Sequence, residues 1–110
     1  MSVVHAAQTE AGRIYRDTRP YPGVYFMRVA RLTPRAWVRR LVNKGDPLAG
    51  FWGALLKNHP AAVLMVCRHR GSCAFTGKRW ETKRYVLLVP SKRLREVQAR
   101  PGYTTNRRTS

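Results

Sequence analysis

The sequence predicts an α+β fold: a small, three-stranded, mostly antiparallel sheet with a tandem pair of helices and a short C-terminal helix, flanked by basic extended termini. Three observations predict it. Runs of β-branched and aromatic residues recur three times, two helices with clear start and stop signals lie between the first two runs, and both chain ends are polar and basic. The chain has 110 residues and 44% hydrophobic content, which suits one small domain. We divide it into an arm (1–22), this domain (23–100) and a tail (101–110).

The arm is weakly periodic, and its end, the segment 19–23, reads Arg-Pro-Tyr-Pro-Gly. Each proline biases its predecessor away from the helical region, so we expect an extended or turning segment there. The first strand follows at 24–32, where Val, Tyr, Phe and Met predominate.

Two helices with almost no linker are predicted next, at about 34–44 and 47–58. Thr33 is a favoured N-cap with Pro34 at the first helical position, and Gly45 is a natural stop. The second helix is apolar almost all round, so we expect it in the core or against a neighbouring subunit. A helix-turn-helix is disfavoured, because a recognition helix needs polar or basic side chains and this helix offers only Lys57.

The rest of the domain is predicted as strand, loop, strand and helix. Residues 61–68 open with an apolar run typical of a buried strand, 69–82 read as a long basic loop, and 84–90 form the third strand. Ser91 then caps a helix at 92–100 whose inner side carries Leu94 and Val97.

Charge is the main functional signal. The chain has 22 Lys+Arg against 5 Asp+Glu, a formal net charge of +17, so the cations cannot be paired internally. Such an excess repels itself and points to a polyanionic partner, with binding that weakens steeply as salt rises. The preference for Arg over Lys suits planar contacts with phosphates and bases; a GC-rich genome explains it equally well.

In and around the basic loop, cationic residues surround Phe75 and Trp80. Basic residues interleaved with aromatic ones suit a surface that follows a nucleic-acid backbone, and Trp80 is a candidate for stacking on a base. The alternative is that Trp80 and Phe75 fold back onto the sheet. The expected RNA contacts are Arg13, Arg16 and Arg19 in the arm, Arg35, Arg39 and Arg40 on the first helix, Arg68, Arg70, Lys78, Arg79, Trp80, Lys83 and Arg84 around the basic loop, and Lys92, Arg93, Arg95, Arg107 and Arg108 near the C-terminus.

Other classes of site find little support. Cys67, His69 and Cys73 lack the spacing of a zinc site, so no metal or cofactor is expected, although a Cys67–Cys73 disulfide is geometrically possible. The five acids are scattered, and we expect no enzyme. No apolar run is long enough for a transmembrane helix, and the N-terminus lacks the pattern of a secretory signal.

These features favour a structural RNA-binding subunit of a large ribonucleoprotein, ribosomal-protein-like and of a mitochondrial ribosome, with rRNA and neighbouring protein subunits as partners. We expect a mitochondrial or otherwise cytoplasmic, non-secreted protein. Two alternatives stay open: a basic accessory subunit of a mitochondrial membrane complex, whose cations would face anionic lipid, and a viral or phage nucleic-acid-binding protein.

Overall fold

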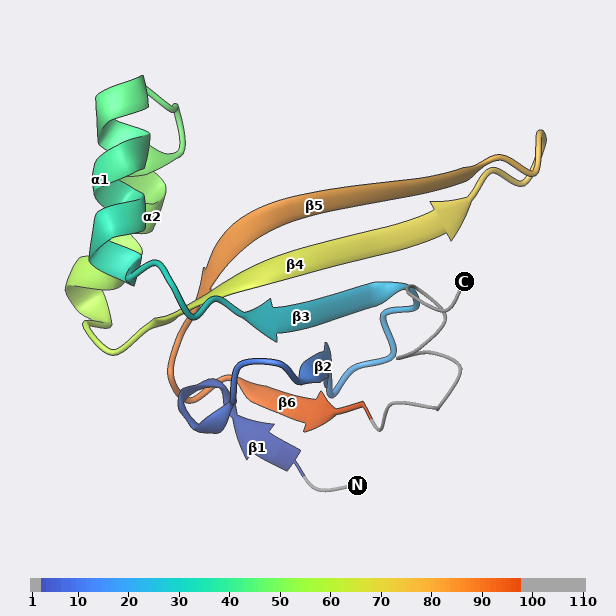
Figure 1. Ribbon diagram of the computed structural model, residues 1–110, viewed down its shortest axis with the longest axis horizontal. Coiled ribbons are helices and arrows are strands. Elements are labelled where there is room, and N and C mark those ends of the chain that lie inside the picture. Colours follow the sequence, from blue (N-terminus) through green and yellow to red (C-terminus); the bar gives the residue numbers. More distant parts are fainter. Residues whose placement is uncertain (1–2, 98–110) are drawn as a thin grey trace.

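The computed structural model describes residues 3–97, which form a six-stranded antiparallel sheet with two helices at one end (Figure 1). The sheet order is β1-β6-β2-β3-β4-β5. The elements are β1 (Val3–His5), the short 3-10 helix η1 (Ala6–Gln8), β2 (Ile14–Asp17), β3 (Val24–Arg28), α1 (Pro34–Lys44), α2 (Ala49–Asn58), β4 (Val63–Ser72), β5 (Arg79–Leu88) and β6 (Arg93–Glu96). The α+β class is confirmed, and the prediction of a small three-stranded sheet is wrong.

The additional strands lie where the sequence indicated an extended arm and a helix. β1 and β2 fall within 1–22, and β6 replaces the helix predicted for 92–100. β6 pairs with β1 on one side and β2 on the other, and Leu94 is fully buried between exposed Arg93 and Arg95. This alternation has the period of a strand. Residues 98–100 and the tail at 101–110 lie outside the described part of the chain.

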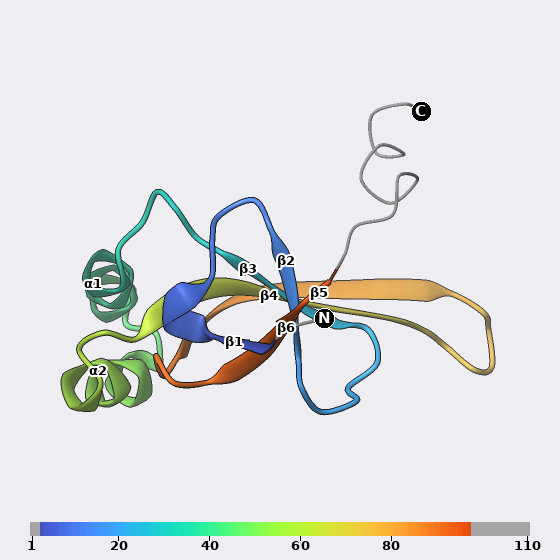
Figure 2. The same ribbon diagram turned by 90° about the horizontal axis from the view of Figure 1, so that it is seen from below.

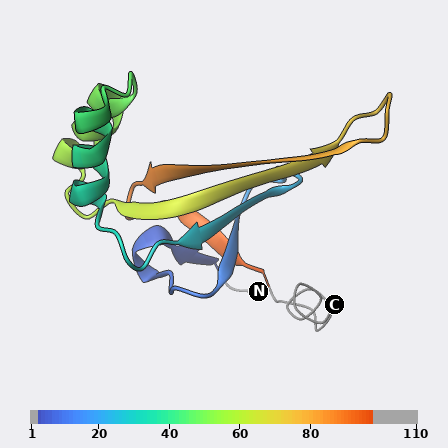
Figure 3. The ribbon, with the colours of Figure 1, turned by 45° about the horizontal axis from the view of Figure 1, so that its top comes forward.

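The predicted basic loop at 69–82 is mostly strand. β4 and β5 stay paired as far as Ser72 and Arg79, which leaves a turn at 73–78. The pairing of β4 with β3 ends earlier, at His69, so the end of the β4–β5 hairpin extends beyond the sheet (Figures 1 and 3). A two-stranded ribbon with both faces in water has no apolar alternation, which is why its sequence resembles a loop.

The helix pair is confirmed, with α2 beginning two residues later than predicted. The Thr33 Oγ1 accepts a hydrogen bond from the Ala36 N–H at 3.1 Å, and Gly45 ends α1 with φ +70°. The Asp46 Oδ1 then accepts from the Leu48 N–H at 2.8 Å, which stabilises the turn into α2. The two helices lie beside each other at one end of the sheet (Figure 2).

The two faces of the sheet carry separate cores. One face, which we call the Met65 face, packs Met65 with Tyr15, Leu94 and Ala6 of η1. The opposite face, the Leu64 face, packs Leu64, Leu87 and Ala62 with Trp37 and Leu41 of α1. Within residues 3–97, the helices cover only one end of the Leu64 face.

The second helix contributes to the core only in part. Trp52, Leu55 and Leu56 are half-buried against the Leu64-face core, whereas Phe51 is 60% exposed. Across residues 3–97, neither helix has the length and apolar character needed to cross a membrane.

Candidate nucleic-acid interface

A row of cations crosses the Leu64 face from strand to strand. Lys83 of β5 lies opposite Arg68 of β4, and Arg68 lies opposite Tyr25 of β3. Continuing the β2–β3 register by one residue places Arg16 beside Tyr25, and Arg16 lies opposite Arg95 of β6. Residues directly opposite on antiparallel strands share a face. We call Arg95, Arg16, Tyr25, Arg68 and Lys83 the cross-strand row.

The dimensions of the cross-strand row suit a nucleic-acid backbone. It spans β6, β2, β3, β4 and β5, which are consecutive in the sheet order. Four steps of about 4.8 Å between neighbouring strands give a row of about 19 Å. A nucleic-acid strand rises about 3.4 Å per phosphate, so the row can follow several successive phosphates.

An aromatic ring lies in the middle of these cations. The Arg16 guanidinium carbon is 5.8 Å from the centroid of the half-buried Tyr25 ring, which is cation–π geometry. Tyr85, two residues after Lys83 and on the same face, is 39% exposed. Sequence reasoning missed both tyrosines as site residues. Side chains alternate between the two faces along the strand Val-Tyr-Phe-Met-Arg, and this alternation was the sequence signal that could have indicated Tyr25.

One acid lies next to the row. The Glu81 Oε2 is 3.5 Å from the Arg68 Nε, and its Oε1 is 3.8 Å from the Arg70 Nε. These side chains are about half exposed, so solvent weakens the attraction, and one carboxylate cannot neutralise two guanidinium groups. The Arg68 Nε–H is itself buried without a hydrogen-bond acceptor among the described residues. A buried donor without a partner is rare.

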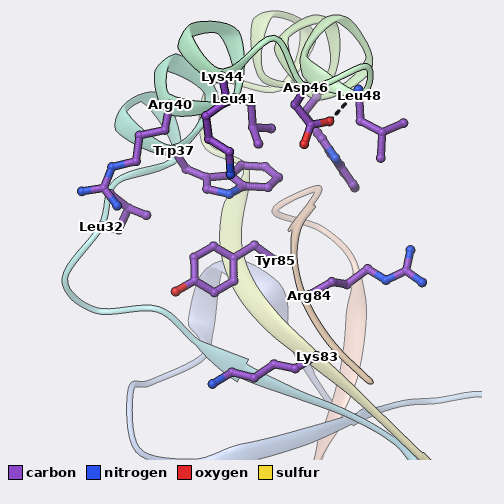
Figure 4. A pocket seen from close by; sticks show the side chains of 11 residues that line it. Leu32, Trp37, Arg40, Leu41, Lys44, Asp46, Leu48, Lys83, Arg84 and Tyr85 are labelled. Carbon is purple, nitrogen blue, oxygen red and sulfur yellow. Dashed lines mark hydrogen bonds between the residues drawn. The ribbon is translucent and has the colours of Figure 1, made fainter. Parts of the chain in front are cut away.

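A cavity of about 420 Å³ lies next to the row, between the helix pair and β5 (Figure 4). The rings of Trp37 and Tyr85 both line it and form an aromatic pair, with their centroids 6.2 Å apart and their planes tilted by 50°. Its cationic lining residues are Arg40, Lys44, Lys83 and Arg84, with Asp46 as the acid. Lys83 and Tyr85 therefore join the cavity to the Leu64 face.

Two further predicted contact residues, besides Arg68 and Arg70, are held in ion pairs. Arg13 donates a hydrogen bond to Glu96 and lies 3.7 Å from Glu10, while the Lys92 Nζ is 2.8 Å from the Asp17 Oδ2. Burial raises the pKa of Asp17, but the hydrogen bonds from Lys92 and from the Arg19 backbone N–H outweigh it and lower the pKa overall. We therefore infer that Arg13 and Lys92 stabilise the contact between β2 and β6, together with the residues that flank these strands.

The remaining predicted cations are distributed over several surfaces. Arg93, Arg70 and Arg79 belong to the Leu64 face by register, and Arg84 belongs to the Met65 face. Arg35 and Arg39 are exposed on α1, Arg19 is exposed before β3, and Lys78 is in the hairpin turn. Arg107 and Arg108 lie outside the described residues.

Trp80 packs on its own hairpin. A Cβ added to Gly71 would lie 2.5 Å from the Trp80 Cζ2, so the ring covers this glycine directly. The ring also meets His69 edge-on at 4.9 Å, and the residue is 43% exposed. This arrangement matches the fold-back alternative for Trp80 but not for Phe75, which is exposed. Base stacking by Trp80 stays a prediction.

The cysteines have contrasting environments. Neither Cys67 nor Cys73 is in a disulfide, and residues 3–97 hold no cluster of three or more His, Cys, Asp or Glu side chains suited to a metal. Burial raises the pKa of Cys67, whereas hydrogen bonding with Thr76 lowers the pKa of Cys73.

No family model, curated protein or solved structure matches this chain. The geometry of the site therefore carries the functional argument.

Proposed function

We propose that this protein is a structural RNA-binding subunit of a large ribonucleoprotein and that its Leu64 face lies against the RNA. The observation that carries the proposal is the cross-strand row, which places four cations in line across five adjacent strands, with Tyr25 in the middle. With a net charge of +17, the chain has far more positive charge than its five acids can pair. The row places part of that excess on one surface.

Tyr25 and Tyr85 favour RNA with unpaired nucleotides over a regular duplex. Bases in loops and bulges can stack on tyrosine rings while neighbouring cations contact the phosphates. The cavity beside Tyr85 offers space for such a base next to Lys83. Duplex DNA presents no unstacked base to these rings.

A place in a mitochondrial ribosome, with rRNA and neighbouring proteins as partners, is our specific version of this proposal. Phe51, Leu48 and Val42 are 60%, 52% and 61% exposed on and between the helices, at the end of the sheet away from the hairpin. Large apolar side chains left exposed on one helix pair suit contact with a neighbouring subunit.

The test is binding of the whole protein to a structured RNA with loops, to duplex DNA and to anionic vesicles across a range of salt. We expect tightest binding to the RNA, with log K falling linearly against log salt. If about eight phosphates are contacted, the slope is about −6 to −7. A flat salt response, or stronger binding to vesicles or duplex DNA than to the RNA, would overturn the proposal.

A further inference from the structure

The turn of the β4–β5 hairpin holds a phenylalanine ring entirely in solvent. Phe75 is 98% exposed, whereas the next most exposed large apolar side chain in residues 3–97 is Val42 at 61%. The ring thus contacts almost nothing in the part of the chain that the structure describes. Phe75 lies in the turn that extends beyond the sheet (Figure 3).

Hydrogen bonds define the conformation of this turn. The Cys73 N–H donates to the Lys78 carbonyl at 2.7 Å, and the Gly77 N–H donates to the Cys73 carbonyl at 2.8 Å. The Lys78 N–H donates to the Thr76 Oγ1 at 3.2 Å, and Gly77 has a φ of +72° that favours glycine. The turn therefore presents the Phe75 ring outward in a defined conformation.

The stem of the hairpin is braced and positively charged. Trp80 packs across Gly71 on the Met65 face, while Arg70 and Arg79 lie on the Leu64 face. Lys78 is exposed at the end of the turn, immediately before β5. An exposed ring is thus flanked by cations on an arm that reaches past the sheet.

We propose that Phe75 stacks on an unpaired base of the bound RNA while Lys78 and Arg79 contact the adjoining phosphates. This inference rests on the proposed RNA-binding function. Stacking accepts any base, because every base has a π face, and cations beside the ring suit the charged backbone. The base belongs to a bulge or loop, since side chains cannot read the deep, narrow major groove of an RNA helix. Phe75 is thus a second stacking candidate on the same hairpin, beside the one predicted for Trp80.

The experiment compares wild type with Phe75→Ala and with Phe51→Ala as the matched control. Phe51 is the same residue type, is 60% exposed, and lies on α2 at the other end of the molecule. The probe is an RNA stem carrying a bulged 2-aminopurine, beside the same stem without the bulge. Binding is measured by titration, and stacking by the change in 2-aminopurine fluorescence.

We expect Phe75→Ala to fold normally, because its ring contacts almost nothing, and to lose the fluorescence change. Its affinity for the bulged stem should fall by about 5- to 150-fold with the salt slope unchanged. Affinity for the fully paired stem should be unaffected, and Phe51→Ala should behave as wild type.

Three results would overturn the inference. The first is wild-type affinity and fluorescence in Phe75→Ala, with RNA binding and its salt slope intact; the RNA-binding proposal would survive this result. The second is an equal loss on the bulged and fully paired stems, because that loss would not come from an unpaired base. The third is no RNA binding by wild type, which would overturn the function and the inference together.

Discussion

The cross-strand row yields a test that separates a specific surface from net charge alone. One variant replaces the four cations of the row with glutamine: Arg16→Gln, Arg68→Gln, Lys83→Gln and Arg95→Gln. The control makes four equivalent replacements on exposed cations outside the row: Arg31→Gln, Arg35→Gln, Arg39→Gln and Lys57→Gln. Arg35 and Arg39 were themselves predicted as RNA contacts, so the control also tests α1 as the competing RNA surface. Each variant removes three arginines and one lysine, so both carry a formal net charge of +13 instead of +17.

The expected size of the effect follows from the register. If each cation of the row contacts one phosphate, the variant loses four contacts, and each contact contributes about 0.7 to the salt slope for single-stranded nucleic acid. The slope should therefore become shallower by about 3, which corresponds to about a thousandfold weaker binding near 0.1 M salt. The control should keep most of the slope of wild type.

The assay is filter binding to the structured RNA from low to moderate salt, with thermal unfolding as the check on folding. Both variants should unfold near the wild-type temperature. The control cations are exposed and contribute little stability. In the row, relief of the repulsion within the Arg16–Arg95 and Arg68–Lys83 pairs offsets the loss of the weak Arg68–Glu81 pair and the Arg16–Tyr25 contact. Equal losses of slope in the two variants would refute the reasoning, because binding would then depend on net charge and not on the Leu64 face.

Three further predictions concern the fold and its titrating groups. Leu94→Ala should lower the free energy of unfolding by about 2–5 kcal/mol in urea denaturation, because Leu94 is fully buried; unchanged stability would contradict the placement of β6 in the core. Cys73 should alkylate faster than Cys67, because its pKa is lowered and that of Cys67 is raised; equal rates measured by mass spectrometry would contradict this. Asp17→Asn should destabilise the protein at neutral pH. Since the folded-state pKa of Asp17 is lowered below 3.8, its contribution is full above the unfolded value and is lost as the pH falls through the folded one. The difference in melting temperature should therefore vanish in strong acid, and its persistence there would contradict the role of the Asp17–Lys92 pair.

The helix pair could be predicted from the sequence because its signals are local. Thr33 and Pro34 start α1, and Gly45 ends it, within a few residues of the segments they delimit. The shift of α2 has an equally local cause: Asp46 accepts from the Leu48 N–H, so the turn continues through Pro47 and the helix begins at Ala49.

The short strands could not be predicted, because their pairing is remote. β1 has three residues and β6 has four, and Val4 finds its partner Leu94 at the other end of the chain. Such segments are too short to show the two-residue period of a strand clearly. The i, i+3 spacing of Leu94 and Val97 therefore predicted a helix in this region. The alternation of Arg93, Leu94 and Arg95 becomes informative only when strands lie on both sides of β6.

The same limitation applies to the candidate site. Arg16, Arg68, Lys83 and Arg95 were each predicted as RNA contacts, but in an arm, at a strand end, at the junction between the basic loop and the third strand, and in a helix. Their alignment depends on register across five strands, which no local pattern contains. Tyr25 was interpreted only as part of a strand, although it occupies the centre of the row.

The placement of like charges supports the proposal that the row binds a polyanion. Arg16 lies directly opposite Arg95, and Arg68 directly opposite Lys83, although like charges in these positions destabilise a sheet. The acids do not relieve both pairs. Glu81 faces Arg68 and Arg70, while the acids nearest to β2 and β6 pair with Arg13 and Lys92. The Arg16–Arg95 pair has no ion-pair partner among the described residues, so its repulsion works against the fold. A polyanion along the Leu64 face would make the contribution of these cations favourable, because cations that repel one another in the free protein would share phosphates in the complex.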